Sequence, residues 1–241
     1  MIYERLTSYF QDLIRRSGLE EEEIWVRARP LTPGEAIGTP SDGDYPLLKG
    51  KERLMEARFR EAKGQAYTDL FGNYAGSPAE IADLPLDNNF QRAVFIASLN
   101  AVMRSLRLIE GTVHCRDHEP EECAAALNTY LADAFGKLKR VGLVGLQPRL
   151  LKALAREYRV RATDLDPENI GRTWSGIVIE PAEDVGEIIE WADLLLVTGT
   201  TIVNQTIELF LDLDRPVVFY GTTIAGPARV LGLNRFCALG H

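Results

Sequence analysis

The chain has 241 residues, and 46% of them are hydrophobic, so it can bury one large core or two small ones and is not a largely disordered protein. Asp and Glu number 35 against 27 Lys and Arg. The net charge of -8 would repel a polyanion, which argues against a nucleic-acid partner. No apolar run reaches the roughly 18 residues of a membrane span, and the N-terminus lacks the layout of a signal peptide. We therefore expect a cytoplasmic protein with no membrane partner.

The first half of the sequence predicts a mixture of helices and strands. Apolar residues spaced by four, beginning with Ile2 and Leu6, predict an amphipathic helix at the N-terminus. Short alternating stretches with nearby Pro and Gly predict strands. In chain order the predicted elements are a helix ending at Gly18, strands at 24–29 and 56–59, a helix capped by Asp87 and reaching about Leu106, and a helix from about Pro120 to Gly136.

From Lys139 onward, short apolar runs alternate with helical stretches. Continuously apolar strands are typical of a parallel sheet that helices cover on both faces. The predicted strands are 141–145, 160–163, 177–179, 194–197, 217–220 and 236–239, and the predicted helices are 150–158, 185–191, 202–211 and 225–231. We therefore predict an α/β protein with an N-terminal α+β domain, residues 1–136, and a C-terminal domain, residues 137–241, that is a Rossmann-like parallel sheet with helices on both faces.

The loops after the predicted parallel strands are rich in glycine and hydroxyl side chains. The carboxyl ends of parallel strands share one edge of a sheet, where small residues let an anionic or polar ligand approach the backbone closely. The sequence therefore predicts a ligand-binding edge. Its candidate residues are Gly145, Gln147, Asp164, Asp166, Thr198, Gly199, Thr200, Thr201, Asn204, Gly221, Thr222 and Thr223.

Two of these loops allow either a cofactor site or an ordinary turn. Asp164 and Asp166 follow the glycines of the first strand by about 20 residues, as the ribose-binding carboxylate of a dinucleotide fold does. The turn at 142–148 lacks two glycines of the G-x-G-x-x-G pattern, so the acidic pair can equally cap a turn. Thr200 or Thr201 can likewise bind an anion or cap a helix, and no lysine accompanies them as in a Walker A loop.

Potential metal ligands lie between the two halves. Residues 114–118 read His-Cys-Arg-Asp-His, and Cys123 follows on the first turn of the next predicted helix. Imidazole and thiol are the donors that zinc, copper(I) and other soft metals prefer, so His114, Cys115 and Cys123 are candidate metal ligands. Their spacing matches no zinc motif, and burial of Cys123 in the core is the alternative. The polar motifs at 50–53 and 64–69 are equally well explained as solvated turns.

Several of these segments together resemble the putative heavy-metal chelation family. The segments are 111–115, 119–123, 144–148, 163–166, 198–204 and 219–226, with 34–38, 50–52 and 64–69 in the front half. The resemblance covers nearly the whole chain. It implies that the front half is similar to the N-terminal domain of enolase, that the back half is Rossmann-like, and that a ligand site lies in the cleft between them.

Residues and resemblance together lead us to expect binding or chelation of a heavy or transition metal ion, or of a metal-containing anionic small molecule, in an interdomain cleft. The alternative is an enzyme with a nucleotide-like cofactor, of the NAD or S-adenosylmethionine type, at Gly145 and Asp164. In that case Cys115 or His114 would be the nucleophile or base. A homo-oligomeric partner protein with a vestigial cleft is a third alternative. The sequence does not decide whether the protein is an enzyme.

Overall fold

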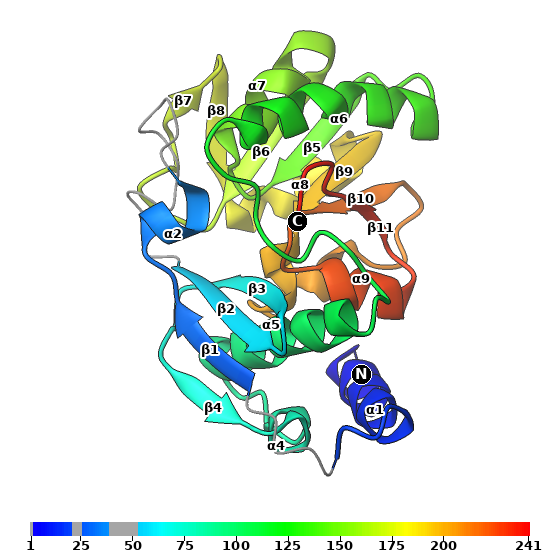
Figure 1. Ribbon diagram of the computed structural model, residues 1–241. Helices are drawn as coiled ribbons and strands as arrows, with labels where there is room; N and C mark the ends of the chain where they lie inside the picture. Colours follow the sequence, from blue (N-terminus) through cyan, green and yellow to red (C-terminus); the bar gives the residue numbers. More distant parts are fainter. Residues whose placement is uncertain (1, 21–25, 39–52) are drawn as a thin grey trace.

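The computed structural model describes residues 2–20, 26–38 and 53–241 (Figure 1). The first part contains α1 (Ile2–Arg16), β1 (Val26–Pro30), α2 (Pro33–Ile37), β2 (Arg53–Phe59), β3 (Ala62–Thr68), β4 (Tyr74–Gly76), α4 (Pro78–Ala82) and α5 (Asn89–Ser105). The second part contains α6 (Glu119–Phe135), β5 (Arg140–Val144), α7 (Pro148–Glu157), β6 (Arg159–Asp164), β7 (Thr173–Trp174), β8 (Ile177–Pro181), α8 (Val185–Trp191), β9 (Leu194–Thr198), β10 (Val217–Tyr220), α9 (Ala225–Leu231) and β11 (Asn234–Phe236). The predicted α/β class is confirmed.

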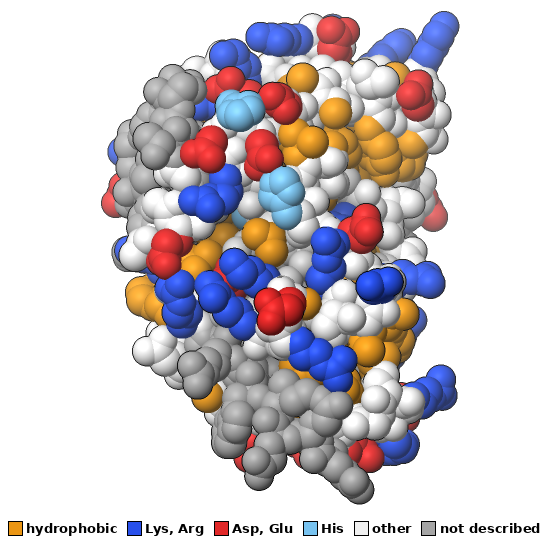
Figure 2. Space-filling view, viewed as in Figure 1, with side chains coloured by type: hydrophobic (Ala, Val, Ile, Leu, Met, Phe, Trp, Pro, Cys, Tyr) orange, Lys and Arg blue, Asp and Glu red, His pale blue; other side chains and the backbone are white. Residues whose placement is uncertain are grey.

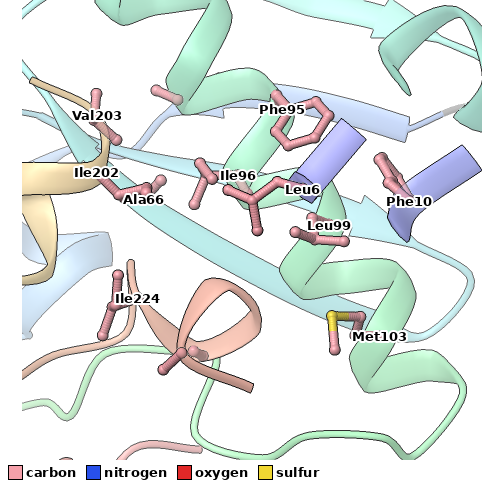
Figure 3. Packing of buried hydrophobic residues seen from close by; sticks show 14 of the residues in the cluster. Leu6, Phe10, Ala66, Phe95, Ile96, Leu99, Met103, Ile202, Val203 and Ile224 are labelled. Atoms are coloured by element: carbon pink, nitrogen blue, oxygen red, sulfur yellow. The ribbon is translucent and has the colours of Figure 1, made fainter. Parts of the chain in front are cut away.

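The first part is an antiparallel sheet in the order β3-β2-β1-β4, which packs against the long helix α5. The apolar stripe of α1 packs on the same helix, and Phe10 meets Phe95 edge to face with ring centroids 5.5 Å apart (Figure 3). Residues 64–68, which a solvated turn could have explained equally well, belong to β3 and pair with β2. The residues of β3 that face α5 are small, whereas strands are usually recognised by β-branched and aromatic residues. The strand was therefore hard to predict. The motif at 50–52 lies outside the described residues.

The second part is a sheet in the order β11-β10-β9-β5-β6-β8-β7. All neighbouring strands are parallel except β7, which pairs antiparallel with β8. The six parallel strands can be numbered 1 to 6 in chain order, with β5 as strand 1 and β11 as strand 6. Their order across the sheet is then 6-5-4-1-2-3, which is the arrangement of doubly wound dinucleotide-binding folds. The strand order reverses between β5 and β9, so loops diverge there and leave room for ligands.

Helices cover both faces of this sheet, and alternate strand residues face two cores. Leu143 and Leu196 face α6 and α7, whereas Leu195 and Val197 face α8, α9 and, beyond them, α1 and α5. Figure 1 shows α6 and α7 on one side of the sheet and the antiparallel sheet with α5 on the other. The prediction of helices on both faces is confirmed. The domain boundary near residue 136 and the likeness to the enolase N-terminal domain stay predictions.

Three predicted details of the elements are wrong. The stretch 202–211 is not an α-helix but two 3₁₀ turns, η2 (Gly199–Ile202) and η3 (Ile207–Phe210), because Gln205 between them has a left-handed backbone (φ 60°) that no α-helix contains. Asn88, not Asp87, caps α5 by accepting the N–H of Gln91 at 3.0 Å. The last strand ends at Phe236, so residues 237–239 lie beyond it.

Within the ranges that the structure describes, no helix is both long and apolar enough to cross a membrane.

Candidate functional site

A cavity of about 130 Å³ lies where the carboxyl edge of the parallel sheet meets the segment before α6, and we call it the thiol pocket. It brings together many of the predicted site residues, because the loops after β5, β9 and β10 open toward that segment. Its lining consists of Tyr67, His114, Cys115, Pro120, Cys123, Leu146, Gln147, Leu150, Thr198, Gly199, Thr200, Tyr220, Gly221, Thr222, Thr223, Phe236 and Cys237.

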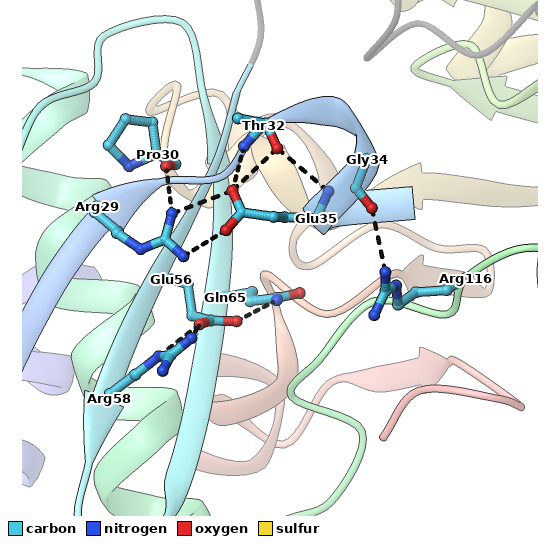
Figure 4. A network of polar contacts seen from close by, with 9 residues as sticks. All are labelled: Arg29, Pro30, Thr32, Gly34, Glu35, Glu56, Arg58, Gln65 and Arg116. Atoms are coloured by element: carbon cyan, nitrogen blue, oxygen red, sulfur yellow. Dashed lines mark hydrogen bonds and ion pairs between the residues drawn. The ribbon is translucent and has the colours of Figure 1, made fainter. Parts of the chain in front are cut away.

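Side chains of β2 and β3 hold the backbone at His114 in place. The backbone N–H of His114 donates to Gln65 Oε1 at 2.7 Å, and Gln65 Nε2 donates to Glu56 Oε2 at 3.0 Å (Figure 4). Arg58 Nε donates to the other Glu56 oxygen at 2.8 Å, which compensates the charge of a buried carboxylate. This support was not predictable from the sequence, because Glu56 and Gln65 face each other only through the β2–β3 register.

The imidazole of His114 is half-buried, and its surroundings favour the neutral form. Burial lowers its pKa, although the contact of Nδ1 with the Cys115 carbonyl oxygen at 2.5 Å acts in the opposite direction. With Nδ1–H donating to that carbonyl, the lone pair is on Nε2, as in histidines that bind metals. The edge of the Tyr67 ring meets the imidazole with centroids 5.8 Å apart.

The other two histidines are exposed. His118 Nε2 lies 3.5 Å from Glu122 and His241 Nε2 lies 3.0 Å from Glu119. Figure 2 shows histidine side chains among acidic ones on this face of the molecule.

All three cysteines of the chain line the thiol pocket as free thiols. Burial raises the pKa of Cys115 well above its ordinary value, and Cys123 and Cys237 add to this rise. Burial also raises the pKa of Cys237, against the opposing effect of Arg235. Sequence reasoning overlooked Cys237 as a site residue, since it lies far along the chain and just after β11.

Backbone pairing at the C-terminus brings Cys237 to this place. Val113 donates to the His241 carbonyl at 2.8 Å, and His241 donates back to the Val113 carbonyl at 3.0 Å. These two bonds join residues 237–241 to the segment that carries His114 and Cys115, so both sides of the pocket wall are fixed together.

Sulfur and nitrogen donors therefore share one cavity, and their chemistry suits a soft metal. Their geometry is less complete, because the described residues contain no group of three or more His, Cys, Asp or Glu side chains arranged to hold a metal ion. His114, Cys115 and Cys123 thus lie together as pocket residues without forming a ready metal centre.

The threonines at the carboxyl edge of the parallel sheet make different hydrogen bonds. Thr198, not Thr200 or Thr201, caps the turn η2, by accepting the N–H of Thr200 at 3.3 Å. Thr223 Oγ1 accepts the N–H of Tyr67 at 3.1 Å and so joins the two sheets. Thr222 is buried, and its Oγ1 has no hydrogen-bond partner within the described part of the molecule. A buried hydroxyl without a partner is costly, so this atom is suited to meet a ligand or a water molecule.

The remaining predicted edge residues line a second cavity of about 510 Å³, which we call the acidic pocket. Gly145, Asp164, Asp166, Thr201 and Asn204 lie there, together with residues from the first part of the chain that sequence reasoning did not connect with a ligand. The two cavities adjoin, and they share Leu146, Thr198, Thr200 and Tyr220.

Asp164 organises the loops of the acidic pocket. Its Oδ2 accepts the N–H of Leu146 at 2.5 Å, and its Oδ1 accepts the N–H of Asp166 at 2.7 Å and Nδ2 of Asn169 at 3.4 Å. Burial raises its pKa, although these bonds oppose the rise. These contacts are those of the turn-capping alternative raised by the sequence.

The fold and its edge pockets are those of a doubly wound α/β protein with an added antiparallel sheet. A family model described as "Putative heavy-metal chelation" matches residues 131–231, which confirms the resemblance inferred from the motifs over that range. No curated protein matches the chain.

Two solved structures from the DUF364 family have a similar fold, and both are described as proteins of unknown function. The protein from Pyrococcus horikoshii has a TM-score of 0.57 and 18% identity, with 92% of this chain and 80% of that chain covered. The protein from Desulfitobacterium hafniense has a TM-score of 0.51 and 17% identity, with 74% of this chain and 72% of that chain covered.

Proposed function

We propose that this protein binds a soft metal ion, carried in a small anionic complex, in the thiol pocket. The observation that supports this most is the meeting of three thiols and a neutral imidazole in one cavity, although they come from three places in the sequence. The family description, heavy-metal chelation, points to the same chemistry.

The form of the metal follows from the donors. A bare ion needs three or four protein ligands, and no such group is arranged among the residues described. A complex that brings part of its own coordination shell needs only one or two, and Cys115, Cys237 and Nε2 of His114 would supply them. The organic part would meet the Thr222 hydroxyl, which has no hydrogen-bond partner among the residues that the structure describes.

Copper(I) held by glutathione is a suitable probe, because the complex is anionic and copper(I) prefers thiolates, and a cavity of about 130 Å³ would take in only the metal and the part of glutathione next to it. Equilibrium dialysis of tag-free protein followed by metal analysis should give about one copper per chain for the wild type. The C115S/C237S double variant should bind at least about tenfold more weakly. Loss of a residue that only orients a metal ligand lowers metal affinity roughly 10- to 100-fold, and loss of the ligand itself should lower it more. Uptake should strengthen with pH, because each buried thiol must lose its proton.

His118→Ala is the matched control for His114→Ala, because His118 is exposed and does not line the pocket. We expect His118→Ala to bind copper like the wild type and His114→Ala to bind less. An unchanged copper content in the cysteine double variant would contradict the proposal.

Thr222→Val provides a test that separates binding from folding. Valine has the shape of threonine and removes the buried, unpartnered hydroxyl, so the ligand-free protein should be as stable as the wild type or more stable by about 1 kcal/mol. Binding of the copper complex should weaken at the same time. Thr223→Val, the neighbouring control, should lower stability by about 1 kcal/mol, because Tyr67 N–H loses its acceptor. Chemical denaturation measures both; a marked loss of stability in Thr222→Val would show that its hydroxyl is a structural group.

A further inference from the structure

The acidic pocket has the position and size of a ligand site that the thiol pocket does not account for. It lies beyond the carboxyl ends of β5, β6 and β9, beside the point where the strand order reverses. Its volume of about 510 Å³ is in the range of small-molecule sites, roughly 300–1,000 Å³. The antiparallel sheet and α5 close its other side through Asp69 and Asn89.

The charge of its lining has one sign. Asp69, Asp164 and Asp166 line the cavity, and none of the other lining residues that the structure describes is Lys, Arg or His. Two of these carboxylates accept hydrogen bonds from uncharged groups: Asn89 Nδ2 donates to Asp69 Oδ1 at 2.7 Å, and the backbone N–H of Glu168 donates to Asp166 Oδ1 at 3.0 Å. A phosphate would therefore meet unfavourable charge, whereas hydroxyls and ammonium groups would find acceptors.

The lining also has an apolar side. Leu165 and Leu209 lie at the cavity with about half or more of their surface exposed, 61% and 52%, and Val185 and Phe210 lie beside them. Exposed apolar side chains at a cavity favour an apolar ligand group that covers them. The lining thus fits a molecule with one flat apolar part and one part rich in hydroxyl or amino groups.

We propose that the acidic pocket binds a phosphate-free nucleoside-type molecule, neutral or positively charged, with its base against the leucines and its hydroxyl or amino groups toward the aspartates. The site includes Gly145 and Asp164, where the sequence suggested a nucleotide-like cofactor, and the proposal narrows that ligand to one without a phosphate group. It is also independent of metal binding in the thiol pocket.

Calorimetry on the full chain with three matched compounds tests this. Adenosine, 5′-amino-5′-deoxyadenosine and adenosine monophosphate share the base and differ in charge. We expect the amine to bind most tightly, adenosine next, and the monophosphate at least about tenfold more weakly than the amine. Asp166→Asn keeps an oxygen for the N–H of Glu168 but removes one charge, so it should reduce the ratio of amine to monophosphate affinity several-fold.

The control variants connect each effect with its own cavity. C115S/C237S should leave adenosine binding unchanged, and Asp166→Asn should leave copper uptake unchanged, since these residues line different pockets. Monophosphate binding as tight as adenosine binding, no binding of any of the three compounds, or an affinity ratio that Asp166→Asn does not alter would each overturn the proposal. A failure of copper binding alone would not affect it.

Discussion

Gly64→Ala is expected to destabilise the protein by about 3 kcal/mol or more. A Cβ atom at this position of β3 would lie closer than 3.0 Å to the carbonyl oxygen of Ala97 and the backbone nitrogen of Ala101, both in α5. Backbone atoms of a packed helix cannot turn aside as a flexible side chain can, so the helix and the sheet must separate. Urea unfolding followed by circular dichroism measures the loss.

Gly186→Ala is the matched control. Gly186 lies in α8 with no atom within 4 Å of an added Cβ, and alanine is the better helix former. We expect this variant to be as stable as the wild type or more stable, by up to about 1 kcal/mol. A Gly64→Ala protein within about 0.5 kcal/mol of the wild type would mean that α5 does not approach β3 as closely as described.

Asn100→Asp should cost about 3–5 kcal/mol and should also disturb the thiol pocket. Nδ2 of this buried residue of α5 donates to the carbonyl oxygens of Gln65, Thr222 and Thr223 at 3.1–3.2 Å, and Oδ1 accepts the N–H of Gly226 at 2.7 Å. A carboxylate would face three carbonyl oxygens with no hydrogen to donate. Because these bonds hold the threonine loop against β3, copper binding should fall together with stability.

Burial disfavours the charged form of the new carboxyl group, so its pKa should rise in the folded protein. The destabilisation relative to the wild type should therefore be largest at neutral pH and smaller as pH falls through that raised value. Asn234→Asp is the control, because its amide makes one exposed contact, with the Val217 carbonyl at 3.3 Å. Equal losses in the two variants would contradict the role assigned to Asn100.

The parallel sheet was predictable because its strands are buried on both faces. Runs such as Leu194–Val197 contain only large apolar residues, and few other local structures use such runs. The strand β3 was not predictable for the opposite reason: Gly64 and Ala66 are small because a helix lies against them, and small residues carry little strand preference. The break at Gln205 was not predictable, because no local sequence pattern marks a left-handed backbone at this residue.

The site was predictable only in part. Topology alone places the loops after β5, β9 and β10 on one edge, so the threonines and glycines could be grouped in advance. It could not be predicted that these residues divide between two cavities, because the division depends on the positions of side chains such as Tyr220 and Leu146. Cys237 and Asn100 were missed because the residues that connect them with the site are more than a hundred residues away in sequence: Cys115 and Cys123 for Cys237, and Thr222 and Thr223 for Asn100.

We propose above all that the thiols and the threonine edge hold one metal-bearing ligand together. Anomalous diffraction from a crystal exposed to the copper(I)–glutathione complex would locate the metal directly. We expect one peak in the thiol pocket, bonded to Cys115 or Cys237, with density for the organic part reaching Thr222. A peak only at the exposed His118 or His241, with the pocket free of copper, would contradict the account.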